Sequence, residues 1–168
     1  MSLEKISEEF FAKGVHCCVY NCPEILTNSS SVFQGVEVSL YPLLGAIQKE
    51  MPNNAHAQQI LKDCKALLKD DVTFEQILDF TEDYLTNPLT KEFSKFDQWP
   101  QNSRQDQMEY MLAGSEHMYS LHKDEKQLIT AVLSEAVFKS CGYVMLHDSW
   151  APKKPVAWIG HDIVARCL

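Results

Sequence analysis

The densest group of potential metal ligands lies near the N-terminus, where residues 16–22 include one histidine and three cysteines. Thiolate and imidazole are the ligands that zinc prefers, and a structural zinc site needs four of them. A second pair of ligands would have to come from a distant part of the chain. If a metal is bound, the sequence predicts that His16, Cys18, Cys22 and His161 hold it.

The same residues could instead form a reactive or ligand-binding pocket assembled from segments 16–22 and 161–167. These two stretches hold four of the six cysteines and two of the six histidines. Chain ends often approach each other in compact domains, which would bring the two segments together. However, the spacing matches no zinc finger, and free cysteine is commonly a small apolar core residue. Packing is therefore the preferred interpretation, and the pocket is the alternative.

Other combinations of nucleophile and base fail on their spacing. Cys141 precedes His147 and Asp148, but residues six apart on a helix point in different directions and cannot form a hydrogen-bonded dyad. His117 and His122 are five apart, whereas two ligands on one helix face need a spacing of four. We interpret these two histidines as surface or capping residues near helix ends.

Motifs for common cofactors are absent from the sequence. It contains no G-x-G-x-x-G, no P-loop, no G-x-S-x-G and no calcium-binding EF-hand loop. A haem needs only one axial histidine, but no histidine here has a flanking signature that selects it. We therefore expect no cofactor, with zinc or haem as the alternatives.

Composition and charge exclude several classes of protein. The chain has 168 residues, 45% of them hydrophobic and 23% charged, as in an ordinary soluble domain. The net charge of −8 disfavours nucleic-acid binding, which needs a clustered basic face. No signal peptide is evident, because the N-terminus is acidic and amphipathic. No membrane-spanning segment is expected, because Glu135 and Lys139 interrupt the longest apolar run. We expect a cytoplasmic protein with six reduced cysteines.

Residues 126–147 give the clearest structural signal. Apolar side chains point in nearly every direction around a helix of this sequence, and only Glu135 and Lys139 mark a polar stripe. A helix that is apolar almost all round is surrounded by other helices. This pattern predicts the central helix of an all-α domain.

The other elements follow from helix starts, helix stops and apolar periodicity. Expected helices cover residues 3–13, 40–51, 54–68, 73–86, a short turn within 89–101, 103–121, and a last helix through Val156, Ile159 and Val164. Residues 15–20 fit either a short strand or a continued helix. The sequence thus predicts a single all-α domain over 1–168, with seven or eight helices around the helix at 126–147.

These observations favour a non-enzymatic cytoplasmic protein that binds a protein partner, as an adaptor, regulator or immunity-type inhibitor. The reason is that packing explains every strong feature of the sequence. The alternative is a small helical enzyme, or a ligand- or metal-binding protein, that uses the Cys/His pocket of segments 16–22 and 161–167. We expect neither nucleic acid nor a membrane as a partner.

Overall fold

A computed structural model describes residues 2–24, 35–93, 104–148 and 152–168, and these form a mainly helical fold. Among them are eight α-helices, one 3₁₀ helix and two short strands, so the predicted all-α class is confirmed. In chain order the elements are α1 (Leu3–Phe11), β1 (Val19–Asn21), η2 (Val36–Leu40), α2 (Pro42–Glu50), α3 (Ala55–Leu67), α4 (Phe74–Thr86), α5 (Pro88–Phe93), α6 (Gln105–Ser120), α7 (Ile129–Asp148), β2 (Val156–Trp158) and α8 (His161–Arg166).

Short polar side chains start several of these helices where the sequence predicts it. Ser2 accepts a hydrogen bond from the first turn of α1, and Asn54 does the same for α3. Thr73 and Gln76 form a complete capping box at α4, with reciprocal bonds of 3.2 and 2.8 Å. Pro42 occupies the first turn of α2, where its missing N–H costs no hydrogen bond. The predicted helix start at Ser103 lies outside the described residues.

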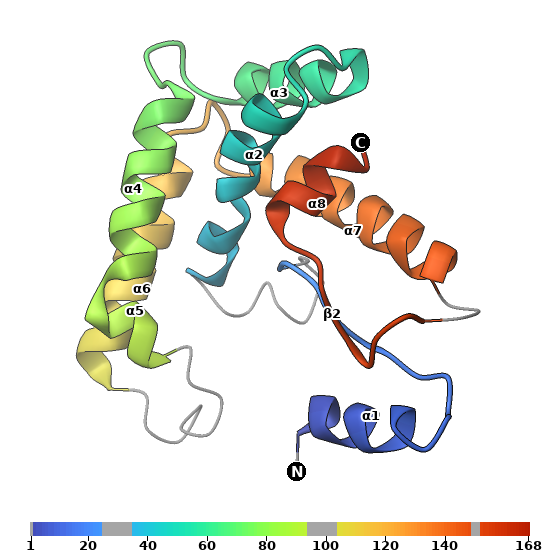
Figure 1. Cartoon of the computed structure of the whole chain (residues 1–168). Coiled ribbons are helices and arrows are strands. Elements are labelled where there is room, and N and C mark those ends of the chain that lie inside the picture. Colours follow the sequence, from blue (N-terminus) through green and yellow to red (C-terminus); the bar gives the residue numbers. More distant parts are fainter. Residues whose placement is uncertain (1, 25–34, 94–103, 149–151) are drawn as a thin grey trace.

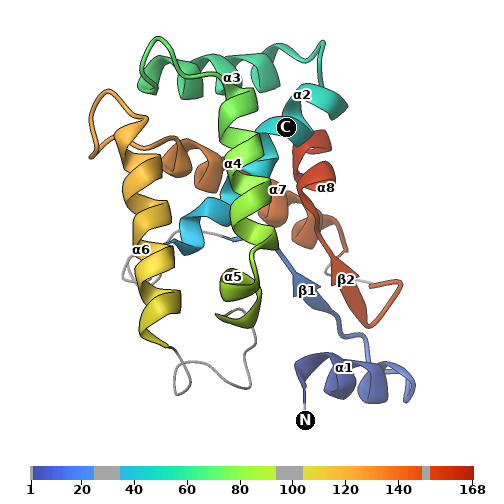
Figure 2. The ribbon, with the colours of Figure 1, turned by 90° about the vertical axis from the view of Figure 1, so that its left-hand side faces the viewer.

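Helix α2 lies at the centre of the molecule and contacts α3, α4 and α8 (Figures 1 and 2). Its side chains Leu43, Leu44 and Ile47 are fully buried. Helices α4 and α6 stand along one side of α2, whereas α7 and α8 lie on the other (Figure 1). Burial of these apolar side chains, at about 25 cal/mol per Å², is the main force that holds the helices together.

A two-stranded parallel ribbon joins the two ends of the chain. Val19 pairs with Val156, and Asn21 pairs with Trp158. The ribbon continues one residue further, because the N–H of Ile159 donates to the carbonyl of Asn21 at 2.8 Å. The predicted last helix is therefore wrong in its first turn: residues 156–158 are a strand, and α8 begins at His161. The sequence left both strand and helix open for residues 15–20. In the structure, residues 19 and 20 belong to β1.

Helix α7 has buried residues as far as Cys141, and its last turns are mostly exposed. Leu133 and Val137 are fully buried, whereas Phe138 and Leu146 are 67% and 74% exposed. The structure thus places the predicted central helix partly in the core, beginning at Ile129 and not at 126. Residues 129–147 are long and apolar enough to cross a membrane by composition, but the same properties are found in core helices.

A buried histidine connects α6 to α7. Nδ1 of His122 lies 2.8 Å from the carbonyl of Met118, and Nε2 accepts a hydrogen bond from the N–H of Ile129 at 3.1 Å. These partners fix the neutral ring with its proton on Nδ1. Since Ile129 is the first residue of α7, His122 acts as a side-chain cap for that helix. Burial lowers its pKa, because the charged ring would be poorly solvated.

This histidine predicts a loss of stability at mildly acidic pH. The unfolded chain takes up a proton near pH 6.5, while the folded chain holds His122 neutral, so the free energy of unfolding falls as pH drops below about 6.5. His161, whose pKa burial also lowers, adds a contribution of the same sign. Urea unfolding between pH 7 and 5 measures the slope, at most about 1.4 kcal/mol per pH unit for one proton.

His122→Gln should be less stable at pH 7 and should show a shallower slope below it. His56→Gln, at an exposed position on α3, is the matched control and should keep the parent slope. An unchanged slope in His122→Gln would contradict the assignment of the neutral, buried ring.

Candidate functional site

The structure separates most of the predicted metal ligands. His16 is exposed, and the Cys18 thiol bonds to the carbonyl of the next residue at 3.6 Å. His161 begins α8 and is hydrogen-bonded to the backbone of Ser39. No three His, Cys, Asp or Glu side chains in the described ranges are arranged to hold a metal ion. The metal site remains a prediction without support from these residues.

Segment 16–22 pairs with residues 155–159 in the parallel ribbon, which brings its C-terminal end near the start of segment 161–167. Cys22 follows the last residue of β1, and Cys167 ends α8. Burial raises the pKa of the Cys141 thiol of α7 to about 12, and the nearby Cys22 and Cys167 thiols raise it as well. Sequence spacing alone could not have brought Cys141 near Cys22. The outcome is a group of three thiols in place of a Cys/His pocket.

A buried carboxylate forms a second polar cluster, which the sequence analysis missed. Glu37 of η2 is 5% exposed and accepts hydrogen bonds from the N–H of Gly35 at 2.8 Å and from the hydroxyl of Ser115. The hydroxyl of Tyr119 also bonds to it. Glu37 takes part in none of the ion pairs found among the described residues. One signal was available: a charged residue flanked by Val36 and Val38.

Three tyrosines near this carboxylate have raised pKa values, mainly because they are buried. Burial raises the pKa of Tyr41, Tyr84 and Tyr119, and the negative charge of Glu37 raises it further in each case. The phenols therefore stay protonated at neutral pH, and the buried hydroxyls of Tyr41 and Tyr84 have no hydrogen-bond partner among the described residues. The bonds from Ser115 and Tyr119 to Glu37 join η2 to α6. The arrangement explains how the core accommodates Glu37.

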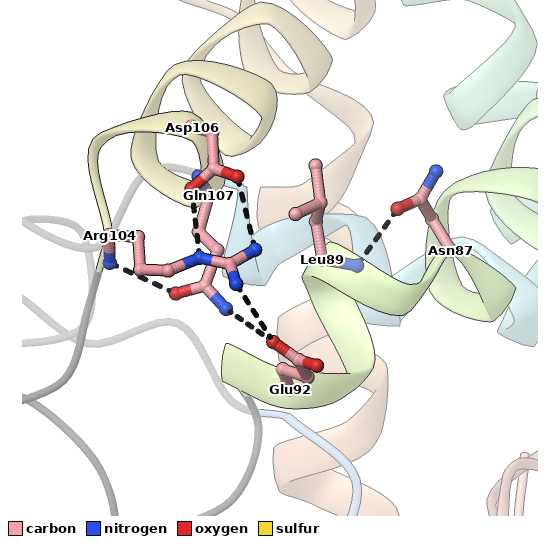
Figure 3. A network of polar contacts seen from close by, with 6 residues as sticks. All are labelled: Asn87, Leu89, Glu92, Arg104, Asp106 and Gln107. Atoms are coloured by element: carbon pink, nitrogen blue, oxygen red, sulfur yellow. Dashed lines mark hydrogen bonds and ion pairs between the residues drawn. The ribbon is translucent and has the colours of Figure 1, made fainter.

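A network of hydrogen bonds and ion pairs at the surface connects α5 to the start of α6 (Figure 3). Arg104 makes a two-pronged contact with Asp106, both bonds at 3.0 Å, and approaches Glu92 of α5 at 3.8 Å. Gln107 reaches the same Glu92 oxygen at 3.3 Å and accepts from the N–H of Arg104. These charged side chains are about half exposed, so the network adds little stability and connects α5 to α6.

Comparison with known proteins identifies the family. A sequence model described as the enoyl-acyl carrier protein reductase FabMG matches residues 1–168. The chain belongs to the FabMG family. An apo structure of FabMG, described as a novel type of enoyl-acyl carrier protein reductase, is 38% identical, with a TM-score of 0.83 over 98% of this chain. An NADH-bound FabMG structure is 35% identical, with a TM-score of 0.71 over 97% of this chain.

The chain matches only part of these FabMG structures, covering 37% and 39% of their lengths. No curated protein matches it. The family assignment corrects two expectations. A non-enzymatic protein-binding role is wrong, because the family is one of reductases, and the enzyme alternative agrees better with it. The expectation of no cofactor is also wrong, because one relative was solved with NADH bound.

The described residues do not fit a bound dinucleotide. NADH sites commonly place the pyrophosphate at an open helix N-terminus after a glycine-rich turn. Here the first turns of α1, α3 and α4 are already closed by side-chain caps, whereas α2, α6 and α8 begin without one. Gly35 faces the hydroxyl of Tyr84, and Gly114 faces its ring. No glycine-rich turn precedes a helix among the described residues.

Proposed function

We propose that this FabMG chain takes part in the NADH-dependent reduction of enoyl-acyl carrier protein as a helical portion of the reductase. The observation that carries the proposal is the family match along all 168 residues. On this proposal the dinucleotide is bound by a nucleotide-bearing portion, equivalent to the part of the solved relatives that this chain does not match. Its partners are thus that portion and the acyl carrier protein, and its compartment is the cytoplasm.

An exposed apolar face on the C-terminal part of α7 supports the proposal that another portion of the reductase covers this chain. Phe138, Tyr143, Met145 and Leu146 are exposed on this face, although α7 has the composition of a core helix. The C-terminal part of α7 extends past α8 to the edge of the molecule (Figure 1). Leaving several large apolar groups in water forgoes about 1.5–3 kcal/mol for each side chain that could be buried. The nucleotide-bearing portion is the occupant that we assign to this face.

A chimera tests the function. In the NADH-bound relative, the matched region is replaced with these 168 residues, and NADH oxidation is followed with and without a trans-2-enoyl-acyl carrier protein. We expect substrate-dependent oxidation within about tenfold of the parent, a difference of about 1.4 kcal/mol in activation free energy. The same relative without the matched region should lose the reduction. The isolated chain should not bind NADH.

Two variants of the α7 face sharpen this test. Phe138→Glu and Leu146→Glu should change the unfolding free energy of the isolated chain by no more than about 0.5 kcal/mol, because both positions are exposed. In the chimera the same changes should lower the melting temperature and the activity. A chimera that binds NADH and melts cooperatively, yet never reduces the enoyl substrate, would refute the proposed function.

A further inference from the structure

The hydrogen bonds of the ribbon show which backbone groups lie at the outer edge of β2. The N–H of Val19 donates to the carbonyl of Pro155 at 2.9 Å, and the N–H of Ile159 donates to the carbonyl of Asn21 at 2.8 Å. In a parallel pair, successive residues of one strand direct their backbone groups alternately toward and away from the partner strand. The bonds at Pro155 and Ile159 therefore set the alternation along β2.

Two residues of β2 direct their backbone groups away from β1. Val156 is opposite Val19 and Trp158 is opposite Asn21, so within β2 it is Ala157 that faces β1 with its N–H and carbonyl. The N–H and C=O groups of Val156 and Trp158 form the outer edge. None of the backbone hydrogen bonds that join separate elements of the described chain involves either residue.

Each face of the ribbon packs against a neighbour, whereas the edge of β2 has none within the described chain. On one face, Ala157 is 7% exposed and Tyr20 packs against the core. On the other face, the side-chain amide of Asn21 donates to Glu4 of α1 at 3.2 Å. Trp158 is nevertheless 68% exposed. Parallel strands rarely stand as an isolated pair, because parallel sheets are normally larger and covered.

We propose that the edge of β2 is a docking site for an extended segment of the nucleotide-bearing portion of the reductase, which adds a strand to the ribbon. The inference rests on the proposed function, because it names where that portion is attached. The FabMG structures have enough further chain to supply such a segment, since this chain covers only 37% and 39% of them. NADH-binding folds are commonly built on parallel sheets, so an extended segment is the expected kind of partner.

The sequence and position of β2 favour this occupant. An edge strand that stays in solvent usually carries a charge or a proline within it, whereas Val156–Trp158 is entirely apolar. The net charge of −8 opposes pairing of this edge with a second copy of the chain. Residues 149–155, which span at most about 30 Å, separate β2 from α7 in the sequence, so one domain-sized partner can contact both the edge and the exposed face of α7.

Hydrogen exchange in the chimera described above tests the docking site. Exchange is read residue by residue in the isolated chain and in the chimera, by mass spectrometry with electron-transfer fragmentation. We expect the amides of Val156 and Trp158 to exchange about 100-fold more slowly in the chimera, because an added strand accepts hydrogen bonds from them. The amides of Ala157 and Ile159, which face β1, are the internal controls and should be protected in both proteins.

Proline substitutions test the same edge through stability. Val156→Pro removes an outward N–H, which an edge strand tolerates, so the isolated chain should melt within about 2 °C of the parent. In the chimera the same change should lower the melting temperature by roughly 5 °C, because the strand there is no longer at an edge. Ala157→Pro removes an N–H that faces β1, and this matched control should lower the melting temperature of the isolated chain as well.

Three outcomes would overturn the proposal. A chimera that reduces the enoyl substrate while Val156 and Trp158 exchange as fast as in the isolated chain would leave the proposed function standing without the added strand. Slow exchange in the isolated chain that depends on its concentration would make a second copy the occupant. If the chimera does not fold, fast exchange at the aligned positions of the intact NADH-bound relative would refute the added strand. An inactive chimera with both amides protected would instead refute the function and support the docking site.

Discussion

Replacing Ala136 with Asp is expected to unfold this FabMG chain under mild conditions. Ala136 lies on α7 at 4% exposure, next to the fully buried Val137. A carboxylate there would lose its water and has no cation on the buried face of α7 to pair with. The cost is roughly 4 kcal/mol or more, which is a large part of the margin of a whole domain. Urea unfolding followed by circular dichroism measures the difference.

The matched control is Ala131→Asp, which places the same side chain on the exposed face of the same helix. In the first turn of α7 an acidic residue also suits the helix dipole, so we expect a change within about 0.5 kcal/mol. If the two variants unfold at the same urea concentration, α7 does not face the core as the structure places it.

Replacing Gly35 with Ala should have the second largest effect. Gly35 has a φ of +92°, a region that costs other residues about 1–2 kcal/mol. A Cβ atom there would lie 2.4 Å from the hydroxyl oxygen of Tyr84 and 2.9 Å from the backbone carbonyl of Met111. Since the second atom belongs to the backbone, relief requires α6 to move. Overpacking of this kind adds about 1–3 kcal/mol, for a total of roughly 2–5 kcal/mol.

Gly14→Ala separates the two causes. Gly14 has a φ of +83°, but no atom lies within 4 Å of its added Cβ. The unfolding free energy of Gly14→Ala should therefore fall only by the conformational cost, about 1–2 kcal/mol. Adding Tyr84→Phe to Gly35→Ala should recover part of the loss, because it removes the nearest atom. Equal losses at Gly14 and Gly35 would mean that contact with Tyr84 and α6 contributes nothing.

Local chemistry made much of the fold predictable from sequence. Helix ends depend on residues a few positions away, such as the capping box of Thr73 and Gln76 or the proline in the first turn of α2. The expected helices 3–13, 40–51 and 73–86 therefore lie close to α1, α2 and α4. The ribbon was not predictable, because strands of three residues are too short for an alternating pattern. Its pairing depends on residues at opposite ends of the chain.

The polar sites were harder to predict for a different reason. Glu37 can be buried because Ser115, Tyr119 and the N–H of Gly35 bind it. Two of these partners are distant in the sequence, so no local pattern predicts the contact. Cys141 was considered with His147 on its own helix, whereas the groups that act on its pKa, Cys22 and Cys167, come from distant parts of the chain. The enzymatic family could not be inferred from motifs, since the described residues contain no nucleotide-binding loop.

The parallel ribbon has a consequence for how this protein is made. A ribosome releases the chain from the N-terminus, so Val19–Asn21 leaves it long before Val156–Trp158 has been synthesised. Until then the edge of β1 has no partner, and α1 lacks the hydrogen bond from the Ser7 hydroxyl to the carbonyl of Pro155. Helices α2 to α6 can pack meanwhile through contacts close in sequence. The N-terminal segment is therefore the last part to be secured, and during synthesis it is the part most open to proteolysis or to pairing with another chain.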